Sequence, residues 1–220
     1  QAENLWWVGL FAIAMAYLES AVVVYLRRIY GISDLILSVP QFDPQIGAIE
    51  LGRELATLVM LLTVGWVAGR KFQSRLGLAI FAFGVWDIFY YIWLRVFIGW
   101  PQTLLDPDLL FLLPLPWWGP VLSPILIAAL MVIGGALAVT KDEHELRLLP
   151  SFMDWALLIG GIQTILYTFM ADALSALPAD ARTLNQLRPS EFNWPVYLVG
   201  FVMLFLFIWR TAKSAQTIST

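Results

Sequence analysis

The sequence predicts an all-α protein, a polytopic bundle of about six membrane-spanning helices that forms a single transmembrane domain over residues 1–220. Hydrophobic residues make up 60% of the chain and charged residues only 13%, whereas roughly a quarter of the residues in soluble domains are charged. The mean hydropathy of +0.77 agrees with a lipid environment. The apolar residues also lie in blocks of about 20, the length that a helix needs to cross a bilayer core.

Six such blocks follow one another along the chain, separated by polar segments. The expected helices cover residues 5–27, 46–69, 76–99, 121–140, 150–173 and 194–212. The first block contains Glu19 and lacks both a basic start and an Ala-x-Ala exit, so we interpret it as a spanning helix rather than a signal peptide. Two connections are short, at 70–75 and 141–149, and three are longer, at 28–45, 100–120 and 174–193.

Basic residues predict the orientation of this bundle. The side of the two termini carries Arg70, Lys71, Arg75, Lys141, Arg147, Arg210 and Lys213, and the opposite side carries Arg27, Arg28, Arg95, Arg182 and Arg188. Cytoplasmic loops are enriched in Lys and Arg, and all three lysines lie on the first side. We therefore expect both termini in the cytoplasm and the protein in the inner membrane of a bacterium.

The longer connection at 100–120 is itself apolar. Leu109–Leu113 is followed by a segment rich in proline and tryptophan, Pro114–Pro120. Tryptophan is enriched at the membrane–water interface, so we expect this outer loop to lie in the interface or to enter the membrane as a re-entrant segment. Trp100, Trp117 and Trp118 are then expected at headgroup depth.

Composition excludes several classes of function. The net charge of −3 and the lack of a Lys/Arg cluster argue against binding of nucleic acid. The absence of cysteine excludes an iron–sulfur cluster, and the only histidine, His144, lies in a charged connection, which argues against haem. No lysine lies within a spanning block, which argues against retinal. No cofactor is predicted, and the standard hydrolase and metalloprotease motifs are absent, so catalytic residues are not assigned.

Four acids lie inside the apolar blocks, namely Glu19, Glu50, Glu54 and Asp87. Ionisable groups at membrane depth are costly and often functional. With the predicted helix directions, the four acids occupy one thin layer in the outer half of the first three helices. Glu50 and Glu54 share a helix face because they are four residues apart.

Other polar residues occur at the same depth. Asp87, Tyr91 and Arg95 share a face of the third helix, as Glu19, Val23 and Arg27 do on the first. The predicted site consists of Glu19, Glu50, Arg53, Glu54, Asp87, Tyr91 and Arg95, and Gln163, Tyr167 and Thr168 of the fifth helix are candidates for its wall.

Four interpretations of this site remain open. The acids and arginines balance well enough to form an ion-pair network with a structural role only. Alternatively, the arginines bind a small polar ligand or lipid headgroup, which is the preferred interpretation because Arg recognises carboxylate and phosphate groups. Carboxylates also suit a hard cation such as Ca²⁺ or Mg²⁺, or a proton relay. A di-iron centre is disfavoured because Glu-x-x-His pairs are absent.

Three classes of function follow from these interpretations. The first is a binding or transport protein. The second is a non-catalytic accessory subunit of a larger membrane complex, with Trp117 and Trp118 contacting partner subunits. The third is a membrane enzyme that acts on a lipid-soluble substrate, with Asp87 or Glu54 as general acid or base.

Four stretches resemble an uncharacterised group of bacterial multi-spanning membrane proteins. They are Glu-Ser-Ala-Val-Val-Val-Tyr-Leu-Arg at 19–27, Gly-Arg-Glu-Leu-Ala-Thr at 52–57, Phe-Gly-Val-Trp-Asp-Ile-Phe-Tyr-Tyr at 83–91 and Pro-Leu-Pro-Trp-Trp-Gly-Pro at 114–120. The resemblance extends over roughly the first 135 residues and implies a bundle of about six helices. It implies no particular activity.

Overall fold

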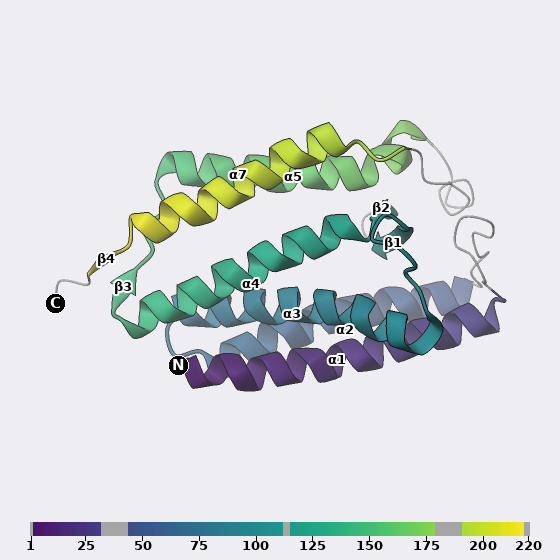
Figure 1. Ribbon diagram of the computed structural model, residues 1–220, viewed down its shortest axis with the longest axis horizontal. Coiled ribbons are helices and arrows are strands. Elements are labelled where there is room, and N and C mark those ends of the chain that lie inside the picture. The colour runs from purple at the N-terminus through teal and green to yellow at the C-terminus, as the bar shows by residue number, and fades with distance from the viewer. Residues whose placement is uncertain (1, 32–43, 112–114, 179–190, 218–220) are drawn as a thin grey trace.

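A computed structural model describes residues 2–31, 44–111, 115–178 and 191–217 (Figure 1). The described residues form six long α-helices: α1 (Ala2–Ile29), α2 (Pro44–Ala68), α3 (Phe72–Ile98), α4 (Leu122–Glu143), α5 (Phe152–Ser175) and α7 (Trp194–Lys213). Four short strands accompany them: β1 (Pro107–Phe111), β2 (Trp117–Pro120), β3 (Leu146–Arg147) and β4 (Gln216–Thr217). The predicted all-α bundle is confirmed, and each helix begins and ends within a few residues of its predicted bounds.

All six helices are long and apolar enough to cross a membrane. Large apolar side chains are exposed on their outer faces, as at Val67 (82% exposed) and Phe152 (90% exposed). Such surfaces are stable when lipid covers them, and the chain is therefore a multi-pass membrane protein. Both termini lie at one end of the bundle (Figure 1).

Helix α3 is the centre of the larger part of the bundle, because it packs against α1, α2 and α4. Its buried side chains Leu78, Ala82 and Trp86 form one core cluster with residues of α1, α2 and α4. Helices α5 and α7 pack mainly on each other, with a second cluster around Phe169 and Tyr197. The molecule thus has a layer of α1, α2 and α3, a middle helix α4, and a layer of α5 and α7 (Figure 1).

Small residues allow α3 and α4 to approach closely. A Cβ atom added at Gly84 would lie 2.5 Å from the carbonyl oxygen of Ala128, and one added at Gly135 would lie 2.5 Å from the carbonyl oxygen of Gly77. Neither distance is compatible with a side chain larger than hydrogen. Close backbone contact through small residues is a common way for membrane helices to gain packing energy without a hydrophobic driving force.

Specific polar contacts join the helices. Tyr197, which is fully buried, donates a hydrogen bond to the carbonyl oxygen of Ser123 at 2.6 Å and so links α7 to α4. Arg210 pairs with Asp154 at 2.6 Å and links α7 to α5. Ser20 of α1 donates to the carbonyl oxygen of Tyr90 in α3 at 3.0 Å. These contacts satisfy polar groups that lipid could not solvate.

The predicted outer loop at 100–120 contains a hairpin that the sequence analysis did not foresee. Strands β1 and β2 pair antiparallel, with Asp108 opposite Gly119 and an irregular register between Leu109 and Phe111. Strand β2 packs against α4 and α5. Its Trp118 is only 5% exposed, so this side chain contacts the chain's own residues. The depth of Trp100, Trp117 and Trp118 in the bilayer stays a prediction.

Some predicted features lie outside the described residues. They include most of the outer connections expected at 28–45 and 174–193, of which residues 32–43 and 179–190 are not described. Arg182 and Arg188, which entered the charge count, belong to these segments, as Pro114 belongs to the undescribed residues 112–114.

Candidate functional site

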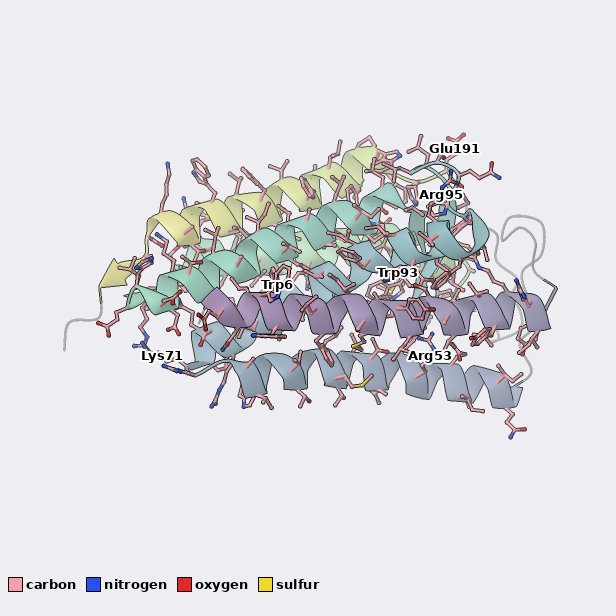
Figure 2. The ribbon with its side chains drawn as sticks, turned by 60° about the horizontal axis from the view of Figure 1, so that its bottom comes forward. Trp6, Arg53, Lys71, Trp93, Arg95 and Glu191 are labelled. Atoms are coloured by element: carbon pink, nitrogen blue, oxygen red, sulfur yellow. The ribbon has the colours of Figure 1, made fainter. Side chains whose placement is uncertain are left out.

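Arg53 of α2 is the cation around which the first group of acids assembles. Its guanidinium pairs with Glu19 of α1, and its Nε donates to Glu50 at 2.7 Å. Thr57 donates a hydrogen bond to the second oxygen of Glu19 at 3.3 Å. Figure 2 shows Arg53 between α1 and α2. Side chains of α1 and α2 thus meet in an ion-paired cluster.

A second polar group surrounds Asp108 at the start of β1. Tyr91 of α3 donates a hydrogen bond to this carboxylate at 3.0 Å, and Arg27 of α1 lies 3.9 Å from it. The Arg27 guanidinium also lies over the ring of Trp100, 4.1 Å from its centroid. Burial raises the pKa of Asp108 from 3.8 to about 6, although the Arg27 charge and the Tyr91 hydrogen bond oppose this shift.

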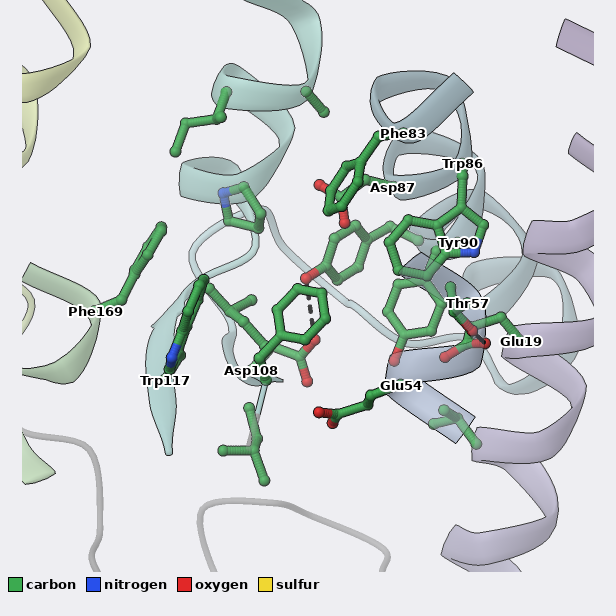
Figure 3. A pocket seen from close by; sticks show the side chains of 18 of the residues that line it. Glu19, Glu54, Thr57, Phe83, Trp86, Asp87, Tyr90, Asp108, Trp117 and Phe169 are labelled. Atoms are coloured by element: carbon green, nitrogen blue, oxygen red, sulfur yellow. Dashed lines mark hydrogen bonds between the residues drawn. The ribbon is translucent and has the colours of Figure 1, made fainter. Parts of the chain in front are cut away.

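Asp87 is different from these acids. Its carboxylate points into a space between α3, α4 and the hairpin (Figure 3). Across the residues that the structure describes, this side chain has no hydrogen bond or ion pair. An unpaired carboxyl group at membrane depth is costly, which makes Asp87 the residue of the site that a structural role explains least.

The polar residues surround a cavity of about 330 Å³. Its polar wall comes from α1, α2, α3 and β1, and its opposite wall comes from α4, α5 and α7 with apolar side chains that include Ile127, Ile165 and Leu204. A cavity of this size lies near the lower end of the range found for small-molecule sites. The site therefore has a polar half and an apolar half.

Aromatic side chains cover much of the remaining wall. Phe83, Trp86, Tyr90, Tyr91, Phe111, Trp117, Trp118 and Phe169 all line the cavity. Trp117 stacks on Phe169, with ring centroids 6.2 Å apart and an angle of 13° between the planes. Figure 3 shows this pair across the cavity from Trp86 and Tyr90. The faces of such rings carry partial negative charge.

Acids outnumber arginines in the lining. The lining includes five carboxyl groups, Glu19, Glu50, Glu54, Asp87 and Asp108, and two guanidinium groups, Arg27 and Arg53. Arg28 and Arg95 do not line the cavity, so the arginines there are too few to balance its acids. The excess of acids disfavours an anionic ligand.

Most predicted site residues do meet at this cavity. Six of the seven line it, namely Glu19, Glu50, Arg53, Glu54, Asp87 and Tyr91. Arg95 does not, because its guanidinium instead donates to the carbonyl oxygens of Gly99 and Pro101 at the end of α3. Figure 2 shows Arg95 far from Arg53.

The predicted wall on α5 has a different composition. Gln163 is exposed and Tyr167 is 57% exposed, so both lie away from the cavity. Thr168 is buried but donates to the carbonyl oxygen of Thr164 at 2.8 Å. The face of α5 that lines the cavity instead presents Ile162, Ile165, Leu166 and Phe169.

Sequence reasoning missed four polar lining residues. Arg27 shares a face with Glu19 but is not among the predicted site residues, and neither are Thr57 and Tyr90. Asp108 was missed because it lies in a loop. An acid within an otherwise apolar stretch, between Pro107 and Leu109–Leu113, was the available signal.

Three acids of the cavity lie beside arginines. Within the ranges that the structure describes, no three His, Cys, Asp or Glu side chains come close enough together to hold a metal ion. The carboxylates of Glu19 and Glu50 instead share Arg53, while Asp108 lies beside Arg27.

No protein-family model, curated protein or solved structure matches this chain. The polar half of the cavity offers negative charge and hydroxyl groups, and its apolar half offers aliphatic and aromatic surface. This combination is typical of a site for a small organic molecule that has one polar end.

Proposed function

We propose that this protein binds or transports a small ligand with a polar end in the cavity between α3, α4 and the β1–β2 hairpin. The observation that carries the proposal is the carboxyl group of Asp87, which faces a cavity of about 330 Å³ without a partner in the described part of the chain. Ligand pockets typically combine apolar walls with a few polar groups that fix orientation. This cavity has the same composition.

A purely structural ion-pair network explains the site less well. It accounts for Glu19, Glu50 and Asp108, each of which has an arginine nearby. It does not account for Asp87, and a network selected only for stability needs no open space beside it. Replacing buried ion pairs by apolar residues is often neutral or stabilising, so retained charge around a cavity favours a binding role.

The cavity also has a proposed position in the membrane. The hairpin lies at the end of the bundle opposite to the two termini (Figure 1). With the termini in the cytoplasm, as the basic residues favour, the cavity occupies the outward half of a bacterial inner-membrane protein. A ligand then reaches it from the outer leaflet or from the outer side of the membrane.

The competing proposal is an accessory subunit of a membrane complex. Trp118 is buried within this chain, and Trp117 is half-buried and stacks on Phe169. This weakens the argument that these tryptophans bind other subunits, although the apolar helix faces remain available for such contacts.

Native mass spectrometry of the protein, gently extracted from its own membrane, tests the proposal. We expect a discrete small mass bound to the wild type and lost from Leu166→Trp, because Leu166 lines the cavity on α5 and a larger side chain fills it. Ile159→Trp is the matched control, since Ile159 lies two turns earlier on α5 and is 52% exposed. Equal spectra for all three proteins without any small adduct, or a stable hetero-complex instead, would contradict the proposal.

A further inference from the structure

The charge of the cavity lining identifies the sign of the ligand. Five carboxyl groups and two guanidinium groups leave an excess of three potential negative charges around one small volume. Arg53 is engaged by Glu19 and Glu50, and Arg27 lies between Asp108 and the ring of Trp100. Neither arginine is therefore free to bind an added anion without first losing its present contacts.

The cavity is instead suited to a ligand that carries a positive charge. Asp87 faces the cavity without a partner among the described residues, and the hydroxyl group of Tyr91 already donates to Asp108. Aromatic faces near these acids attract cations, as the Arg27 guanidinium over Trp100 shows within this chain. A cation beside Asp87 gains an ion pair and ring contacts together, and it removes the cost of an unpaired carboxylate.

The apolar half of the cavity determines the rest of the ligand. Ile127, Met131, Ile165, Leu166 and Leu204 present hydrocarbon surface opposite the acids. An inorganic ion leaves this surface uncovered, whereas an organic molecule with a hydrophobic body covers it. Ile162 belongs to the same wall and is 43% exposed, so the wall continues to the lipid-facing side of α5.

We infer that the ligand is a hydrophobic amine, a small organic cation whose protonated head lies at Asp87 and whose apolar body lies between α4, α5 and α7. This inference rests on the proposed function and specifies its substrate class. An uncharged lipid or an organic anion with the same body fits the apolar half equally well but brings no positive charge to Asp87.

A matched series of probes tests the inference. 4-Phenylbutylamine, 4-phenylbutan-1-ol and 4-phenylbutanoate share one body and differ in the charge of the head. Binding is measured by equilibrium dialysis against the protein in phosphatidylcholine nanodiscs, and empty nanodiscs give the amount of each probe dissolved in lipid. We expect the amine to bind at least about ten times more tightly than the alcohol, since hydrogen bonds to charged groups are the stronger ones.

Three variants locate the effect. Asp87→Asn keeps the shape of the side chain and removes its charge, and we expect it to abolish the preference for the amine over the alcohol. Asp172→Asn is the control, because Asp172 is an acid on α5 that does not line the cavity. Leu166→Trp, which fills the cavity, should weaken the binding of all three probes.

The outcomes separate this inference from the proposed function. Equal binding of all three probes, or tighter binding of the carboxylate, with loss of binding in Leu166→Trp would overturn the cationic ligand and leave a ligand-binding cavity in place. A preference for the amine that survives Asp87→Asn would overturn the assigned position of the head. Absence of binding by every probe would overturn the inference, and with no native adduct it would overturn the proposed function too.

Discussion

Removal of the Arg53 charge should destabilise the bundle more than any other single charge removal at the cavity. Arg53 holds Glu19 of α1 and Glu50 of its own helix, and the three side chains are 22%, 12% and 8% exposed. Surface ion pairs contribute less than about 1 kcal/mol, but loss of one partner from a buried pair costs about 3–5 kcal/mol. Since Arg53 is partly exposed, we expect Arg53→Gln to cost about 3 kcal/mol of unfolding free energy.

A double-mutant cycle separates the ion pair from other effects of the substitution. Glu19→Gln alone should cost about 1 kcal/mol, because Arg53 keeps Glu50. In the Arg53→Gln background the same change removes an uncompensated carboxylate and should recover about 1 kcal/mol. The expected coupling between the two residues is therefore about 2 kcal/mol.

Reversible unfolding in mixed micelles, followed by tryptophan fluorescence, measures these free energies. Arg95→Gln is the control, since Arg95 is exposed, lies away from the cavity and donates to the carbonyl oxygens of Gly99 and Pro101 after its own helix. If Arg53→Gln costs no more than this control, or if the two single effects simply add, then the ion-paired cluster does not hold α1 and α2 together.

Three further predictions address packing, pH dependence and topology. Gly84→Ala should cost about 1–3 kcal/mol because its Cβ would meet the α4 backbone, whereas Gly52→Ala, with nothing within 4 Å, should stabilise the helix by up to about 1 kcal/mol in the same unfolding assay. Burial raises the pKa of Asp108 in the folded protein to about 6, so the folded state binds this proton more tightly than the unfolded state does. The free energy of unfolding should therefore fall by up to about 3 kcal/mol as the pH rises from 4 to 7. Asp108→Asn should remove this part of the pH dependence. The chain contains no cysteine, so single cysteines at Gln102 and Ser214 report topology directly: an impermeant maleimide should label the first in intact cells and the second only after lysis, and the reverse pattern would refute cytoplasmic termini.

The helices were predictable because their signal is local. Each spanning segment is a run of apolar residues about as long as the bilayer is thick, and the depth of an acid within such a run follows from its position. Sequence evidence alone therefore placed Glu19, Glu50, Glu54 and Asp87 in one layer, and all four line the cavity.

The remaining features depend on tertiary contacts that no local pattern encodes. The packing of α5 on α7 decides which side of α5 faces the cavity. The polar residues Gln163 and Tyr167 were predicted to line the cavity, but they lie on another side of this helix. Asp108 enters the site through the hairpin, whose pairing of β1 with β2 is not visible as alternation in so apolar a segment. Arg95 bonds to the carbonyl groups after α3 because Gly99 ends the helix there with a positive φ of 71°.

The central claim is that the cavity beside Asp87 holds a ligand. Electron cryo-microscopy of the protein extracted from its own membrane tests this most directly. We expect a separate density between Asp87 and Phe169, in contact with the carboxylate at one end and with the α5 wall at the other. A map in which α5 and α7 close onto α4, so that side chains fill this space, would contradict it.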